Sequence, residues 1–93
     1  MGDQWEQIGF VISSRYRVAV LTRLAESPAT PSQIAADEGI GIASVSNALS
    51  NLRDRDLVEL LVPEDRRKGS IYGITERGEE LWDEIQREGL LDE

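Results

Sequence analysis

Neutral hydrogen-bonding side chains gather in the middle of the chain, on a segment whose apolar residues follow a helical spacing. Those apolar residues recur at intervals of three, four and three, and they are Ile42, Val45, Leu49 and Leu52. The spacing predicts a helix over 42–54 that turns this stripe toward the core. Asn47 lies at the centre of the opposite side, and its carboxamide can pair with two adjacent major-groove sites of adenine. We therefore expect a helix that reads base edges; the alternative is a polar face that only meets solvent.

A basic loop is the second candidate for binding. The chain has one run of three consecutive bases, Arg66, Arg67 and Lys68. It separates two β-prone segments, 58–62 and 70–75, which together predict a hairpin with a cationic tip. Such a tip can reach the phosphates of a nucleic acid or enter a narrow minor groove. The alternative is an edge hairpin kept soluble by charge, and the two acids that precede the run partly offset it.

Side chains suited to catalysis or metal binding are scarce. The chain contains no cysteine and no histidine, which excludes thiolate zinc sites and nucleophile–histidine mechanisms. Neighbouring carboxylates such as Glu79 and Glu80 lie in an acidic helical segment, where solvated charge explains them best. We predict no enzyme activity, no catalytic residue, no metal site and no cofactor. Because the sequence has no apolar run of membrane-spanning length and no secretion signal, we expect a cytoplasmic protein without a membrane partner.

The net charge of −8 comes mostly from the C-terminal end. Residues 76–93 hold eight acids against two bases, which leaves a net charge of −2 on residues 1–75. An acidic end can coexist with a DNA-facing surface elsewhere on the molecule. The excess of acids, in a chain with few aromatic residues, is suggestive of proteins from salt-loving organisms.

Capping and turn signals indicate the elements that must position these groups. One domain is expected over 1–93, with helices at 14–26, 31–38, 42–54 and 76–88 and a hairpin at 58–74. Thr30 and Gln33 form a predicted capping box for the second helix, and Thr75 caps the last one. Asp56 is expected in the left-handed conformation, which aspartate tolerates better than most residues. Residues 3–12 fit two structures equally well: a helix with Trp5, Ile8 and Ile12 on one stripe, or a short strand over 10–12 after a glycine.

Two further expectations concern apolar residues. In the hairpin, alternation would place Val58, Leu60 and Val62 on one face and pair Leu61 with Ile71 on the other. The apolar stripe of the last helix is broader than a two-stranded sheet needs, so we expect a homodimer. Its contacts would come from Trp5, Phe10, Trp82 and Ile85. The alternative is that these side chains cover the chain's own core.

The order of helix, helix-turn-helix, hairpin and capped helix resembles the winged helix-turn-helix domain of MarR- and ArsR-like transcription regulators, particularly small haloarchaeal ones. The matching stretches are RYRVAVLTRLAESPATPSQIA, IASVSNALSNLRDRDLVEL and DRRKGSIYGITERGEEL. The resemblance covers roughly residues 13–85. It implies an α+β fold, mainly helical, with a two- or three-stranded antiparallel wing.

The resemblance also implies roles for individual residues. A recognition helix would turn toward the major groove Ala43, Ser44, Ser46, Asn47 and Ser50. The wing would bring to the backbone or minor groove Arg66, Arg67 and Lys68. The start of the preceding helix would place near a phosphate Thr30, Ser32 and Gln33. The sequence departs from the family at Asn47 and Ser50, where a basic residue is usual, and at Asp56, which replaces a frequent glycine.

Together these features predict a sequence-specific, dimeric regulator that binds duplex DNA across two half-sites about 34 Å apart. Arg15 or Arg17, at the start of the first predicted helix, is a further candidate for a phosphate contact. The alternative is a winged-helix module that has lost DNA binding and binds protein instead, which the acid excess would allow.

Overall fold

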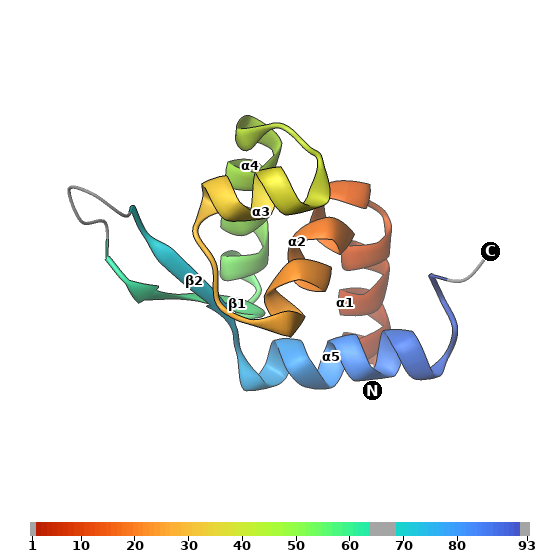
Figure 1. Ribbon diagram of the computed structural model, residues 1–93. Helices are drawn as coiled ribbons and strands as arrows, with labels where there is room; N and C mark the ends of the chain where they lie inside the picture. The colour runs from red at the N-terminus through yellow and green to blue at the C-terminus, as the bar shows by residue number, and fades with distance from the viewer. Residues whose placement is uncertain (1, 64–68, 92–93) are drawn as a thin grey trace.

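The computed structural model describes residues 2–63 and 69–91, which form five helices and a two-stranded sheet. In chain order these are α1 (Gly2–Ile12), α2 (Arg15–Glu26), α3 (Pro31–Glu38), α4 (Ile42–Asp54), β1 (Val58–Val62), β2 (Ile71–Ile74) and α5 (Glu76–Arg87). Figure 1 shows α5 running across the base of the other helices, while the hairpin of β1 and β2 extends to one side. This arrangement confirms the predicted winged helix-turn-helix fold.

The N-terminal segment, whose type the sequence left open, is a helix. α1 packs against both α2 and α5. Its buried side chains are Ile8 and Val11, whereas Trp5 is 57% exposed and Ile12 is 37% exposed. Of the predicted stripe of Trp5, Ile8 and Ile12, only Ile8 therefore points inward. α1 turns the side with Ile8 and Val11 toward α2 and α5.

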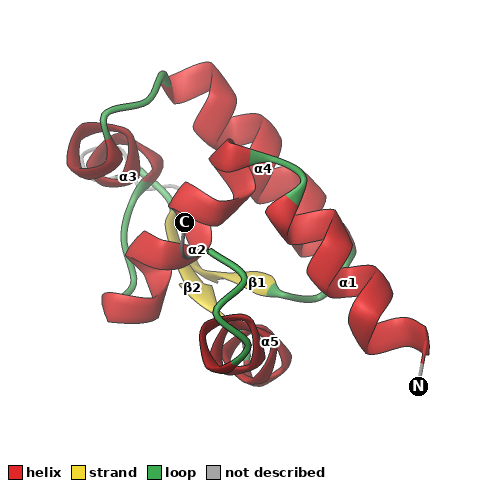
Figure 2. Cartoon of the chain, turned by 90° about the vertical axis from the view of Figure 1, so that its right-hand side faces the viewer, coloured by secondary structure: helices red, strands yellow, loops and turns green. Residues whose placement is uncertain are grey.

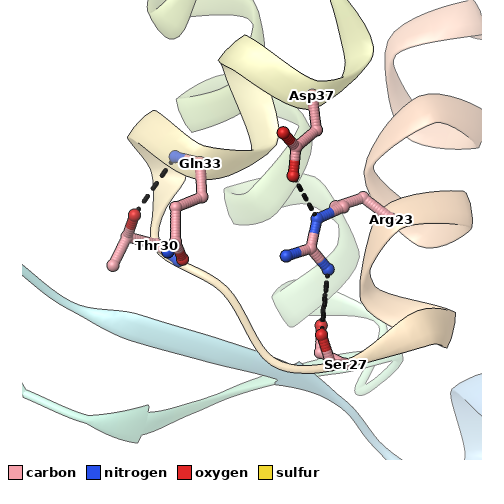
Figure 3. A network of polar contacts seen from close by, with 5 residues as sticks. All are labelled: Arg23, Ser27, Thr30, Gln33 and Asp37. Atoms are coloured by element: carbon pink, nitrogen blue, oxygen red, sulfur yellow. Dashed lines mark hydrogen bonds and ion pairs between the residues drawn. The ribbon is translucent and has the colours of Figure 1, made fainter.

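Polar contacts hold α3 against α2 (Figure 3). Nε of Arg23 donates to Oδ2 of Asp37 over 2.8 Å, and Nη1 of Arg23 donates to the carbonyl of Ser27 over 3.0 Å. The Arg23 side chain is 13% exposed but Asp37 is 55% exposed, so this is a surface ion pair that contributes about 0.2–1 kcal/mol. Thr30 and Gln33 form the predicted capping box, with N···O distances of 3.1 and 2.9 Å. The capping box thereby fixes the start of α3, and the ion pair of Arg23 with Asp37 connects α3 to α2.

α4 buries one side and leaves the other open. The buried side consists of Val45, Ala48, Leu49 and Leu52, none more than 3% exposed. Ile42 belongs to the predicted stripe but is 50% exposed, which corrects that part of the prediction. It is the first residue of α4, directly after the turn that follows α3, and the stripe enters the core only one turn later.

The two strands pair in antiparallel fashion, with an irregularity that the sequence did not indicate. Val58 pairs with Ile74, but Ile71 pairs with Val62 because the register shifts between Leu60 and Val62. The predicted cross-strand pair of Leu61 and Ile71 is therefore wrong. An inserted residue of this kind leaves the ladder and bends the strand.

β2 makes two further contacts, one with the displaced Leu61 and one along its other edge. Leu61 lies over Gly73, where a Cβ atom would come within 2.6 Å of Leu61 Cδ1. On its other edge, β2 meets the segment between α2 and α3. There Ala29 and Tyr72 exchange backbone hydrogen bonds of 3.0 and 2.9 Å. A third strand is thus reduced to a single bridge that ties the hairpin to the start of the helix-turn-helix.

A compact set of contacts joins the end of α4 to the start of α5. In Figure 2, α5 is seen along its axis, below the sheet. Asp56 has the predicted left-handed conformation, with φ of 62°. Thr75 Oγ1 donates to the carbonyl of Asp56 over 2.7 Å and accepts from the amide of Gly78 over 2.9 Å. Gly78 is buried, and a Cβ atom there would overlap the carbonyl oxygen of Leu57 and approach Ile74 Cγ1 to 2.7 Å. We call Asp56, Leu57, Thr75 and Gly78 the α5 lock.

Gly78→Ala should destabilise the protein by about 1–3 kcal/mol, because the added methyl group meets backbone that cannot move aside cheaply. Gly9→Ala is the matched control, since a Cβ atom at this helical glycine has nothing within 4 Å. The control should gain about 0.5–1 kcal/mol from helix propensity alone. Urea unfolding at one fixed salt concentration compares the two, and equal effects at both glycines would contradict the lock.

Candidate nucleic-acid interface

The outer face of α4 carries the residues predicted to enter a groove. Its exposed members are Ala43, Ser46, Asn47 and Ser50, while Ser44 is half-buried. They point outward because the opposite stripe of the same helix is packed into the core. The face offers hydroxyl and carboxamide groups on short side chains. Such a surface can hydrogen-bond to base edges without long side chains that hold the backbone away.

The N-terminal end of α4 adds backbone donors to this face. Its N-cap residue is Gly41, and no side chain caps the first turn. The first amides of a helix have no partner within the helix, and the aligned peptide dipoles place partial positive charge there. The first turn contains no acid that would offset this charge. The end of α4 is therefore suited to a negatively charged or acceptor group.

The start of α3 supplies a smaller set of polar groups. Thr30 and Gln33 already hydrogen-bond to each other's backbone in the capping box. Ser32, between them, is exposed and makes no such contact in the described part of the chain. Of these three candidates for a phosphate contact, Ser32 has the hydroxyl that the fold itself does not use.

The two arginines at the start of α2 have different surroundings. Arg15 is exposed, and its guanidinium carbon lies 5.1 Å from the centre of the Tyr16 ring. Arg17 is half-buried; its Nη1 donates to the carbonyl of Phe10 over 2.7 Å and to Ser13 Oγ over 3.2 Å. Arg15 can therefore move toward a ligand, whereas Arg17 is held in one position.

A hollow of about 170 Å³ lies between the start of α2 and the outer face of α4. Its lining residues are Ser14, Tyr16, Arg17, Ser44, Asn47, Ala48 and Asn51. The sequence did not indicate Ser14 or Tyr16 as site residues. Helical spacing did place Asn51 on the outward side around Asn47, one turn after Asn47 and two turns after Ser44. Its neighbours from α2 could not be found without the packing of the two helices.

The predicted wing contacts fall outside the part of the chain that the structure describes. Arg66, Arg67 and Lys68 are not among the described residues, so their roles stay a prediction. The strands on either side of them extend away from the helices in Figure 1. The described outer residues of β1 are apolar, with Leu61 46% exposed and Val62 43% exposed.

The structure corrects the predicted dimer contacts. Trp82 is 7% exposed and Ile85 is fully buried, so both belong to the chain's own core. α5 packs against α1, α2 and β2, which together cover the broad apolar stripe. Phe10 is half-buried, and the guanidinium carbons of Arg17 and Arg55 each lie 4.0 Å from the centre of its ring. Among the four predicted contacts, only Trp5 presents a largely exposed side chain.

The acidic helix lies away from the polar face. Figure 1 places α5 at the opposite end of the molecule from the turn between α3 and α4. On α5, the hydrogen bond from Arg87 lowers the pKa of Glu84, and a hydrogen bond with Glu88 acts in the same direction. The Glu84 carboxyl group therefore stays ionised at neutral pH. The charge of α5 is concentrated where it does not oppose a polyanion at α4.

Two properties of the described residues bear on the class of site. They contain no group of three or more carboxylate, histidine or cysteine side chains that could hold a metal ion. Within the same residues, no helix is long and apolar enough to cross a membrane.

Solved structures share this fold. The homodimeric winged helix-turn-helix DNA-binding domain Mb0332 of Mycobacterium bovis, a possible ArsR-family transcriptional regulator, is 24% identical, with a TM-score of 0.73 and coverage of 97% of this chain and 83% of that one. The MarR family regulator NMB1585 of Neisseria meningitidis is 23% identical, with a TM-score of 0.73 and coverage of 91% and 61%. A mutant of ZitR from Lactococcus lactis is 24% identical, with a TM-score of 0.71 and coverage of 80% and 51%. The chain thus spans about half the length of ZitR, and at these identities the likeness establishes the fold.

Sequence comparison gives the family. A search of curated proteins found no match. In contrast, residues 5–89 match the HVO_A0261 N-terminal domain, which is almost the whole chain. The chain belongs to this haloarchaeal family, the HVO_A0261 N-terminal domain, and has the winged helix-turn-helix fold of MarR- and ArsR-type regulators.

Proposed function

We propose that the chain is a cytoplasmic, non-enzymatic transcriptional regulator that binds specific sites on duplex DNA. The observation that carries this proposal is the outer face of α4, which is exposed, uncharged over its first three turns and composed of short hydrogen-bonding side chains. Such a helix fits the width and depth of the major groove. The similar fold of ArsR- and MarR-type regulators supports the same use of this helix.

In this proposal each polar group of the interface has a role. Asn47 pairs with an adenine edge, and Ala43, Ser44, Ser46 and Ser50 contact neighbouring base pairs. The start of α3, with Thr30, Ser32 and Gln33, lies along the phosphate backbone, as do Arg15 and Arg17. The wing tip, with Arg66, Arg67 and Lys68, contacts the backbone or the minor groove. Phosphate contacts fix the position of the protein, and contacts to base edges give specificity.

A dimer would read two half-sites about one helical turn, ~34 Å, apart. Mb0332, which has the same fold, is homodimeric, and this supports a dimer here. On this chain the exposed Trp5 of α1 is the remaining part of the predicted contact, since Phe10 is half-buried with Arg17 and Arg55 over its ring. The buried Trp82 and Ile85 would support that surface from within the core.

A second candidate function is a winged-helix module that binds protein. The net charge of −8 and the absence of any base in the first three turns of α4 favour it. The two functions differ in what they bind, so direct tests with DNA separate them.

Selection of bound fragments from genomic DNA tests the proposed function most simply. We expect enrichment of a motif with two symmetry-related halves at low salt, and weaker enrichment in near-saturating potassium chloride, because the proposed phosphate contacts depend on counterion release. A basic recognition helix would lose affinity steeply with salt, whereas a neutral one depends less on counterion release. A single half-motif would contradict the dimer. No enrichment at either salt concentration would favour the protein-binding alternative.

Replacing Arg66, Arg67 and Lys68 together by alanine should weaken binding to every duplex, because the wing is proposed to contact phosphates and not bases. The slope of log affinity against log salt should fall by roughly 0.9 for each phosphate that the wing no longer neutralises. Fluorescence anisotropy with a selected duplex measures both effects.

Arg77→Ala with Arg87→Ala is a suitable control, because it removes two exposed positive charges from α5, away from the interface. It should leave the salt slope nearly unchanged. A loss in the control of about two-thirds of that in the wing variant, in proportion to two charges removed against three, would mean that the wing acts only through net charge.

A further inference from the structure

The hollow between α2 and α4 has the composition of an anion site. Of its seven lining residues, only Ala48 lacks a polar side-chain group. The others provide three hydroxyls, two carboxamides and the guanidinium of Arg17, all of which can donate hydrogen bonds. No carboxylate lines it, although the chain has 18 acidic residues. One positively charged residue among neutral donors therefore lines the hollow, without a negative partner in its wall.

Arg17 is preorganised for such a role. Its Nη1 is held by the carbonyl of Phe10 at 2.7 Å and by Ser13 Oγ at 3.2 Å, and its guanidinium carbon lies 4.0 Å from the centre of the Phe10 ring. Its Nε is buried and has no hydrogen-bond partner among the described residues. Because Nε is buried, an external acceptor does not reach it. Arg17 instead contributes to the hollow the positive charge of a guanidinium that no carboxylate neutralises within the described residues.

A second guanidinium strengthens the positive potential at this corner. Arg55, which follows α4, lies 4.0 Å from the centre of the same Phe10 ring and donates to Gln7 Oε1 over 3.1 Å. Within the described residues, the ion pairs of the protein involve Arg23 and Arg87, and neither Arg17 nor Arg55 has a carboxylate partner. In a protein with excess acid, two neighbouring cations are thus left for an external anion.

We propose that this hollow binds a backbone phosphate of the DNA strand that flanks the groove entered by α4. Asn47 and Ser44 line the hollow and also belong to the outer face of α4, so its occupant lies beside the base edges that this face would read. The inference rests on the proposed DNA-binding function and adds a phosphate site to it. Arg17 supplies the charge, and Asn51 with Ser14 supplies neutral donors on either side.

Asn51→Asp tests this site with little change in shape, since it puts one negative charge into the wall of the hollow. Gln86→Glu is the matched control, because it makes the same amide-to-carboxylate change at an exposed position on α5. With a selected duplex in fluorescence anisotropy, Asn51→Asp should weaken binding about tenfold, as expected for loss of one charged hydrogen bond, and lower the salt slope by roughly 0.9. Gln86→Glu should change affinity less than about twofold, because exposed charges far from the ligand are screened.

Replacing single DNA phosphates by an uncharged group gives an independent measurement. Methylphosphonate placed at successive positions of the selected duplex should weaken binding of the parent protein at one flanking phosphate in each half-site. At that phosphate, the same substitution should cause no further loss in Asn51→Asp or in Arg17→Gln, since these variants no longer make the contact. A variant that merely unfolds would lose affinity for every duplex, whether or not it carries a methylphosphonate. This difference separates a structural effect from loss of the site.

The outcomes distinguish the two proposals. If the parent protein binds no duplex, the proposed function fails and the phosphate site fails with it. If the parent binds DNA but Asn51→Asp behaves like Gln86→Glu, DNA binding stands and the site is wrong. If inorganic phosphate alone shifts the side-chain amide signal of Asn51 in a saturable way while Asn51→Asp leaves duplex binding intact, the hollow takes small phosphates and the assignment to the DNA backbone is overturned.

Discussion

Burial of one side of α4 determines what the molecule can present to a partner. Four side chains, Val45, Ala48, Leu49 and Leu52, are at most 3% exposed. Burying one large aliphatic side chain is worth about 1.5–3 kcal/mol. Rotating the helix by one residue, about 100°, would expose most of the stripe and cost much of the ~5–15 kcal/mol that stabilises a typical domain. The outward direction of Asn47 is therefore set by the hydrophobic core, although Asn47 makes no core contact itself.

The other elements hold α4 and the hairpin in a fixed relation to that core. The ion pair of Arg23 with Asp37 connects α2 to α3, and the bridge of Ala29 with Tyr72 connects the same region to β2. The α5 lock joins the end of α4 to the start of α5 through Thr75, whose hydroxyl serves as both donor and acceptor. A hairpin attached at both of these points projects in a defined direction from the recognition helix. The proposed contacts of the wing depend on that direction.

Local chemistry predicted much of this fold from sequence. The capping box of Thr30, the left-handed Asp56 and the cap at Thr75 each depend on a few neighbouring residues, and each is confirmed. The limits of α3 and α4 agree with the predicted ranges for the same reason. The sequence of α1 was ambiguous because Trp5, Ile8 and Ile12 fit a helical stripe, whereas Gly9 and the β-prone residues 10–12 fit a short strand. Only its packing against α2 and α5 resolves it.

The errors concern contacts between segments distant in the chain. The bulge that removes Leu61 from the ladder has no signature in the alternating pattern of β1. Trp82 looked like surplus apolar area because the contribution of α1 to covering α5 was unknown. The hollow at Arg17 and Asn51 combines residues from two helices, so a pattern within either helix could not define it. Sequence thus predicted the face of α4, and the structure added the surface beside it.

Amide chemical-shift mapping during titration with a selected duplex is the most direct test of whether the outer face of α4 binds DNA. We expect the largest perturbations on residues 43–51 and at the starts of α2 and α3, with small changes along α5. Perturbations centred on α5, or an unperturbed α4 under conditions where the complex forms, would contradict DNA binding by this face.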